Sequence, residues 1–107
     1  KAAFLREVIR TLNLPAEVHN CRIEDAKNEL PAEIDCVTAR ALASLKELFE
    51  MQEKILKKPC KSIYLKGQDL DEELTQAAKY WNIDCKILPS VTDPAGHILL
   101  VDRISRR

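Results

Sequence analysis

The chain has 107 residues, enough for one small domain that buries on the order of 60–70% of its unfolded surface. Lysine and arginine together number 17, as do aspartate and glutamate, so the overall charge gives no general attraction to nucleic acid or to an acidic membrane. No apolar run approaches the ~20 residues that span a bilayer. We therefore expect a cytoplasmic protein with one domain over residues 1–107, in which any basic site is local.

The first predicted element is a helix over residues 2–12, where apolar side chains recur at helical spacing until Pro15 ends the run. The chain enters this helix directly from Lys1, without a capping residue, so we expect further elements upstream. Residues 17–21 alternate between polar and apolar side chains and predict a short strand that ends at Arg22. A loop or a short helix is expected over residues 25–30.

Residues 34–38 predict a second strand, and Ser44 with Glu47 three residues later predicts the start of a helix by a capping box. That helix continues along an apolar stripe until Pro59 ends it. Residues 62–65 then predict a third strand.

The last part of the chain predicts a helix and two strands. Asp69 is placed to cap a helix that runs to about Trp81, with acidic residues 71–73 in its first turn. Residues 85–88 and 97–104 are strand candidates joined by a turn-rich link, so we expect them to pair antiparallel. Strands that alternate with helices predict an α/β fold: a mostly parallel sheet covered on both faces, with the final hairpin as an antiparallel edge.

Polar side chains follow each of the first three predicted strands. Arg22 follows the first strand, Arg40 the second, and Lys66 the third. Ligands of open parallel sheets bind outside the carboxyl ends of the strands, because loops and helix starts converge there. We therefore expect these three side chains to line one side of a ligand crevice, although a single charge after a strand is commonly a solvated loop residue.

Several other chemistries find no support. The chain contains only two glycines, so neither Gly-rich nucleotide-binding loop can be written in it. Neither His19 nor His97 stands in a recognisable nucleophile context. The cysteines are spaced 15, 24 and 25 residues apart, without the Cys-x-x-Cys pairing of zinc sites, so we expect reduced apolar side chains and no metal. They are Cys21, Cys36, Cys60 and Cys85.

Four short segments are more specific than the periodic patterns that indicate helices and strands. They read K-A-A-F-L-R at residues 1–6, R-I-E at 22–24, V-T-A-R-A-L-A at 37–43 and Y-L-K-G at 64–67. In this order and spacing they resemble the ribosomal RNA small-subunit methyltransferase G family, also called glucose-inhibited division protein B, over essentially the whole chain.

The resemblance implies a class I, Rossmann-like methyltransferase. Such an enzyme transfers a methyl group from S-adenosylmethionine to N7 of a guanosine in 16S ribosomal RNA, either free or in a precursor of the small ribosomal subunit. It also implies that this chain is the C-terminal part of the domain, without the first two strands and the Gly-rich cofactor loop. We accordingly expect the isolated chain to be unstable or inactive.

The resemblance also implies roles for individual residues. Ile23 and Glu24 match positions that contact the adenosine end of the cofactor, and Arg40 matches an arginine that contacts the cofactor. A carboxylate suits an adenine amine or a ribose hydroxyl, and an arginine offers a planar fork to a carboxylate or phosphate. Two alternatives stay open: Glu24 as a cap of residues 25–30, and Arg40 in an ion pair with an acid such as Asp35 or Glu47.

Basic residues are the candidates for RNA contact. Arg22 and Lys66 match basic positions associated with activity in the family, and Lys1 would be the second residue of a basic pair. The further candidates are Arg6, Arg103, Arg106 and Arg107. A solvated basic tail explains the terminal pair equally well.

The expected chemistry needs no general base, so no catalytic residue is assigned. Guanine N7 carries an in-plane lone pair at neutral pH and attacks without losing a proton, which leaves positioning as the enzyme's main contribution. The alternative function is a non-enzymatic α/β module that binds a nucleotide or a protein and is complete as given.

Overall fold

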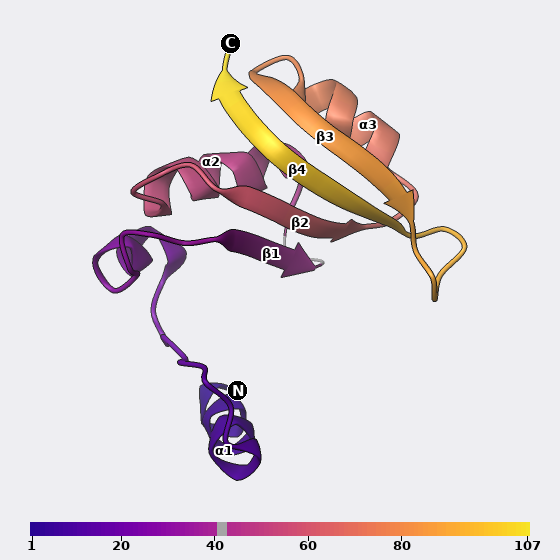
Figure 1. The fold of residues 1–107 in the computed structure, drawn as a ribbon. Helices are drawn as coiled ribbons and strands as arrows, with labels where there is room; N and C mark the ends of the chain where they lie inside the picture. Colours follow the sequence, from indigo (N-terminus) through magenta and orange to yellow (C-terminus); the bar gives the residue numbers. More distant parts are fainter. Residues whose placement is uncertain (41–42) are drawn as a thin grey trace.

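The computed structural model describes residues 1–40 and 43–107, and its helices and strands alternate along most of the chain (Figure 1). In order they are α1 (Ala2–Leu12), the 3-10 helix η1 (Ile23–Asn28), β1 (Cys36–Arg40), α2 (Leu45–Ile55), β2 (Lys61–Lys66), α3 (Leu70–Ala77), β3 (Trp81–Pro89) and β4 (His97–Arg106). None of the helices in these described ranges has the length and apolar composition to cross a membrane.

The four strands form one sheet in the order β1-β2-β4-β3. The pair β1–β2 is parallel, whereas β4 is antiparallel to both β2 and β3. Consequently β1, β2 and β3 run in one direction and only β4 opposes them. The antiparallel pairing of the last two strands is confirmed, and β4 lies inside the sheet while β3 forms its edge.

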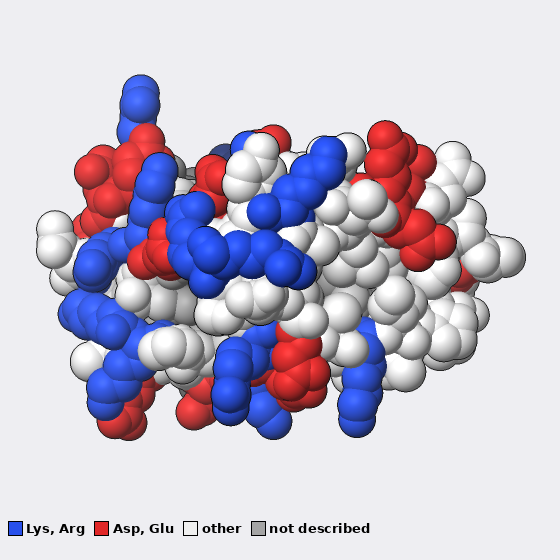
Figure 2. Space-filling model, turned by 90° about the horizontal axis from the view of Figure 1, so that it is seen from above, with Lys and Arg blue, Asp and Glu red and all other residues white. Residues whose placement is uncertain are grey.

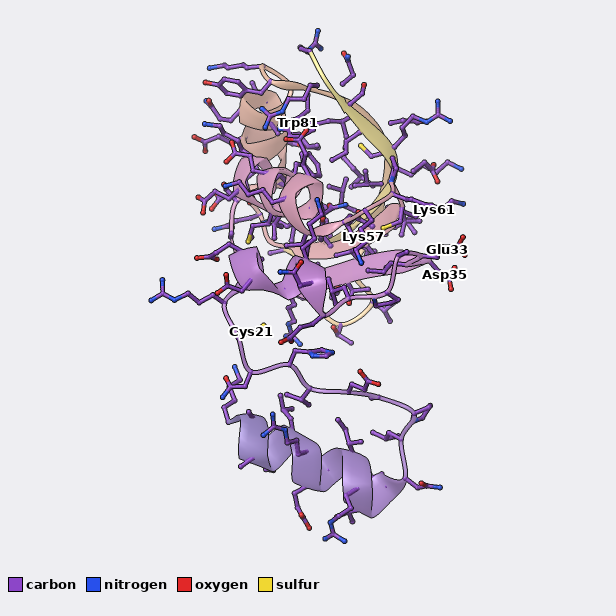
Figure 3. The ribbon with its side chains drawn as sticks, turned by 90° about the vertical axis from the view of Figure 1, so that its left-hand side faces the viewer. Cys21, Glu33, Asp35, Lys57, Lys61 and Trp81 are labelled. Atoms are coloured by element: carbon purple, nitrogen blue, oxygen red, sulfur yellow. The ribbon has the colours of Figure 1, made fainter. Side chains whose placement is uncertain are left out.

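Helices α2 and α3 cover one face of this sheet and form the core with it (Figures 1 and 3). Phe49 of α2 lies against two aromatic side chains, with ring centroids 6.2 Å from Tyr64 and 5.9 Å from Trp81. Leu70 of α3 and Leu99 of β4 are also fully buried in this cluster. The core thus joins both helices to β2, β3 and β4.

Among the described residues no helix covers the opposite face of the sheet, which corrects the expectation of helices on both faces. Ser62 and Tyr64 of β2 point to the helices and are buried, so the alternating residues Ile63 and Leu65 face the other way. Leu65 is 43% exposed there. The remaining helix, α1, stands apart from the sheet in Figure 1 and buries none of its residues.

Two predicted elements are wrong in the described structure. Residues 17–21 form no strand, because no neighbouring strand lies beside them to complete a hydrogen-bonded ladder. Trp81 does not close a helix: α3 ends at Ala77, and Trp81 opens β3, where it is 2% exposed. Its apolar ring satisfies a helical pattern and a buried strand position equally well, so periodicity alone could not separate the two.

Candidate functional site

The carboxyl ends of β1, β2 and β3 lie at the same end of the sheet, on the right of Figure 1. We call this end of the strands the carboxyl edge. Arg40 ends β1 and Lys66 ends β2, as predicted. The antiparallel β4 begins at the same edge with His97, whose Nδ1 lies 3.3 Å from the carbonyl oxygen of Gly67.

Lys66 is held in a network that ties β2 to both helices. Its Nζ lies 2.7 Å from Oε1 of Glu73 in α3 and donates to the carbonyl of Ala43 at 3.0 Å. The same Glu73 oxygen accepts a hydrogen bond from the backbone N–H of Leu45, in the first turn of α2, at 3.1 Å. The two charged side chains are only 9% and 21% exposed, so this ion pair is largely removed from solvent.

The start of α2 is fixed by its cap as well as by Glu73. Oγ of Ser44 accepts a hydrogen bond from the backbone N–H of Glu47 at 3.4 Å, which confirms the predicted cap. An open cavity of about 560 Å³ lies between this helix start and α3. Its walls are Ala43, Ser44, Lys46, Lys66, Asp69, Glu72, Glu73 and Gln76.

Arg40 is exposed, and its side chain forms no hydrogen bond or ion pair with any residue in the ranges 1–40 and 43–107. The alternative in which Arg40 pairs with Asp35 or Glu47 is therefore not what the structure contains. An exposed guanidinium without a carboxylate partner keeps all its donors available for a ligand.

Arg22 lies elsewhere, which corrects the prediction that it ends a strand at the same edge. It is the residue before η1, and its carbonyl accepts from the backbone N–H of Asp25 at 3.0 Å. Helix η1 lies near the amino end of β1 (Figure 1), and Lys57, just beyond α2, donates to the carbonyl of Leu30 at 3.3 Å. The structure therefore places Arg40 and Lys66 at the same end of the sheet, but not Arg22.

Arg40 is in register with Leu65, so its side chain lies on the face opposite the helices, whereas Lys66 lies on the helix face. The expectation that the three side chains line one crevice is corrected, because the cavity beside Lys66 is not lined by Arg40 or Arg22.

Ile23 and Glu24 belong to the same turn as Arg22. Ile23 is half-buried, whereas Glu24 is exposed and its side chain makes no hydrogen bond within the described ranges. Helix η1 has no side-chain cap, so the capping alternative for Glu24 is not observed.

The remaining basic candidates are dispersed. Lys1 and Arg6 are exposed at the start of the chain and on α1. At the C-terminus, Arg106 forms a two-pronged ion pair with Glu53, with N–O distances of 2.8–3.2 Å, and Arg107 donates through Nε to the carbonyl of Ala78 at 2.6 Å. The terminal arginines are thus engaged with the protein rather than forming a free tail.

The cysteines do not form a reactive or metal-binding cluster in the described ranges. Burial raises the pKa of both the Cys60 and the Cys85 thiols above the ordinary value, so these groups stay protonated at neutral pH. No group of three or more His, Cys, Asp or Glu side chains within residues 1–40 and 43–107 is arranged to hold a metal ion.

Glu73 is the site residue that sequence reasoning missed, since all three acids of residues 71–73 were assigned to the helix dipole. A signal for it exists in the helical period. Positions 70, 73 and 77 share one face of α3, and Leu70 and Ala77 are the buried residues of that helix. An acid on the apolar face of a helix requires a buried partner, and Lys66 is that partner.

Comparison with known proteins identifies the family. The model of GidB, rRNA small subunit methyltransferase G, matches residues 1–99. The ribosomal RNA small subunit methyltransferase G of Bradyrhizobium sp. (strain ORS 278) is 48% identical over all 107 residues, as is that of Nitrobacter hamburgensis. The chain covers 48% and 41% of these two relatives, so it spans about half their length. This chain therefore belongs to the GidB family.

Proposed function

We propose that this chain forms the C-terminal part of an enzyme that transfers a methyl group from S-adenosylmethionine to guanine N7 in 16S ribosomal RNA. The observation that carries the proposal is the guanidinium of Arg40 at the carboxyl edge of the sheet, which pairs with no residue that the structure describes, in a chain that the family model covers over residues 1–99. The substrate is the RNA itself or a precursor of the small ribosomal subunit.

The residues matched to the cofactor by the family resemblance suit it chemically. Arg40 offers a planar fork to a carboxylate or phosphate and has no competing partner among the described residues. The carboxylate of Glu24 bonds no described residue and can accept from an adenine amine or a ribose hydroxyl, and Ile23 supplies an apolar contact. Because both lie near the amino end of β1 here, their contact with the cofactor requires the turn before β1 to be repositioned in the assembled enzyme.

When bound, S-adenosylmethionine supplies a sulfonium-linked methyl group as the electrophile. The protein then has to orient the guanine so that its N7 lone pair faces that methyl group, and no proton has to be removed. Recognition of an unpaired guanine leaves N7 free when contacts go to the base face, O6 and the phosphates. We assign the phosphate contacts to the basic side chains Lys1, Arg6 and Arg22.

We further propose that the complete sheet contains two more strands, placed between residues 17–21 and β1. Three observations support this: β1 pairs only with β2 among the described residues, residues 17–21 lack a ladder partner, and the chain spans about half the length of its relatives. The isolated chain should therefore lack methyltransferase activity. Calorimetry tests whether the isolated chain is incomplete. Binding of S-adenosylmethionine by the isolated chain at micromolar affinity, together with cooperative melting, would refute the proposal of missing strands.

The role of Arg40 is tested in a fusion. This chain replaces the matching segment of the Bradyrhizobium relative, and methyl transfer to 16S RNA is followed as N7-methylguanosine by mass spectrometry. Arg40→Ala and Arg40→Lys should each lower the activity, because a lysine keeps the charge but not the fork. Lys86→Ala is the matched control, since Lys86 is an exposed cation of β3 with no part in the site. Undiminished activity of Arg40→Ala would remove Arg40 from the site.

A further inference from the structure

A second cavity lies at the opposite end of the sheet, away from Arg40 and Lys66. It has a volume of about 480 Å³, within the range of small-ligand sites, and lies between the C-terminal end of α2, the start of β2 and the end of β4. Figure 3 looks onto this end of the molecule, with Lys57 and Lys61 near the sheet and Trp81 between the helices and the strands.

The rim of the cavity is basic in a protein whose total charge is balanced. Its cations are Lys57, Lys58, Lys61, Arg103 and Arg106, against the two carboxylates Glu53 and Asp102. Figure 2 shows blue side chains gathered over the left half of the upper face, on the side where β2 begins and β4 ends. Lys58 is paired with Glu33 at 3.2 Å, so the excess of positive charge around the cavity rests on the other lysines and Arg103, which can attract an anion.

The cations differ in how firmly they are held. Arg106 is bound to Glu53, whereas Lys61 lies 3.8 Å from Asp102 with 73% of its side chain exposed. Arg103 makes no hydrogen bond or ion pair with any residue that the structure describes. Lys57 is likewise exposed, and its one hydrogen bond among the described residues goes to the backbone carbonyl of Leu30. Phosphate oxygens would therefore meet available donors at three positions.

The wall of the cavity contains an aromatic ring and unpaired polar groups. Trp81 is 2% exposed and Gln52 is 5% exposed, yet Nε1 of the tryptophan and Oε1 of the glutamine have no hydrogen-bond partner among the described residues. The guanidinium of Arg106 covers the Trp81 ring at 4.4 Å. Since the Arg106 side chain is 52% exposed, it can leave the ring when a ligand enters.

We propose that this cavity binds a single-stranded segment of RNA, at a site separate from the cofactor edge. One base replaces Arg106 on the face of Trp81 and pairs its edge with the unsatisfied donor and acceptor, while flanking phosphates bind Lys57, Lys61 and Arg103. A base edge carries donors and acceptors together, which matches the two unpaired groups. The choice of RNA rests on the proposed function, because a ribosomal RNA substrate presents such segments next to the enzyme.

Trp81 is the only tryptophan of the chain, so it reports on the cavity directly. The fusion with the Bradyrhizobium relative is titrated with a single-stranded RNA hexamer, since the isolated chain is expected to be unstable. The emission of Trp81 is read as the difference from a Trp81→Phe fusion, and binding is measured independently by anisotropy of a dye-labelled hexamer. We expect a saturable change in tryptophan emission and an affinity that falls as salt rises. Lys57→Gln with Lys61→Gln should weaken binding about tenfold and reduce the salt slope by about 1.4, the value for two lost phosphate contacts.

Lys79→Gln with Lys86→Gln is the matched control, because it removes the same charge from exposed positions outside the cavity. If this control weakened binding as much as the Lys57 and Lys61 pair, the site assignment would be wrong. Should the pair unfold, as shown by circular dichroism, Arg103→Gln takes its place, since that side chain makes no hydrogen bond or ion pair within residues 1–40 and 43–107 that the change would remove. No loss of affinity with Arg103→Gln would then overturn the proposal.

Titrations with other anions show whether the cavity prefers RNA. Inorganic phosphate, a nucleoside 5′-monophosphate and poly-glutamate are titrated in parallel. An equal response to the free nucleotide would replace RNA by a small-molecule ligand, and an equal response to poly-glutamate would reduce the site to unspecific charge. In the fusion with the Bradyrhizobium relative, loss of this site should raise KM for RNA and leave kcat unchanged. Complete absence of methyl transfer in the unmodified fusion would instead count against the proposed function, with the fluorescence result unaffected.

Discussion

Removal of the Glu73 carboxylate should destabilise the protein by about 2–3 kcal/mol. Glu73→Ala leaves the ammonium of Lys66, which is 9% exposed, with a single carbonyl partner, and it also removes the acceptor of the Leu45 N–H. Breaking a fully buried pair costs about 3–5 kcal/mol, and the 21% exposure of Glu73 places this pair somewhat below that range.

The assay is urea unfolding of the fusion with the Bradyrhizobium relative, followed by circular dichroism, because the isolated chain is expected to be unstable. Glu72→Ala is the matched control, because Glu72 is an exposed acid in the same turn of α3, and the change removes the same charge and the same dipole interaction. Glu73→Gln keeps an acceptor and should fall between the two. The double variant Glu73→Ala with Lys66→Met should recover part of the loss, since the stranded charge is gone. A difference below about 0.5 kcal/mol between Glu73→Ala and Glu72→Ala would refute the reasoning.

Three further outcomes follow from the charges and the core. The Arg106 guanidinium lowers the pKa of Glu53 from the ordinary value of 4.5, so the stability from this pair is present above that value and lost as the pH falls through the lowered pKa. Glu53→Gln should therefore flatten the decline of stability with acid, measured by melting temperature from pH 6 to about pH 3. Burial raises the pKa of Tyr64 to about 12, which means that the folded protein loses stability as the pH rises above 10, visible by ultraviolet titration. Tyr64→Phe should match or slightly exceed the stability of the natural chain, because the Tyr64 hydroxyl has no hydrogen-bond partner in the described ranges; a loss of more than about 1 kcal/mol in urea would contradict this.

Local sequence signals predicted the elements that build the core. The Ser44 cap, the parallel pair β1–β2 and the antiparallel hairpin were each predicted from patterns within a few residues or from the alternation of elements. The prediction of a strand over residues 17–21 was wrong. A strand depends on a partner that its own pattern cannot supply, and the described sheet offers none there.

The candidate site was predictable to the extent that it depends on strand ends. Arg40 and Lys66 lie at the same end of the sheet because parallel neighbours end together, which the order of elements already implies. Their placement on opposite faces depends on the register of the two strands, which the sequence pattern did not give. The pairing of Lys66 with Glu73 was harder to predict, because six residues lie between them and they belong to different elements, β2 and α3. The second cavity was not predictable, since it combines α2, β2, β3 and β4, whose packing no local pattern contains.

The burial of Lys66 decides how this residue can act in methyl transfer. An RNA phosphate would have to displace Glu73, which holds the ammonium at 2.7 Å in a nearly solvent-free setting. Without the lysine, Glu73 would keep only its bond to Leu45, and the Ala43 carbonyl would lose its donor. Because Ala43 follows Arg40 by three residues, Lys66 is better suited to hold this edge in place than to bind RNA. Lys66→Met in the fusion should therefore lower kcat and stability together without changing the salt dependence of RNA binding, and a reduced salt slope would restore Lys66 as a phosphate contact.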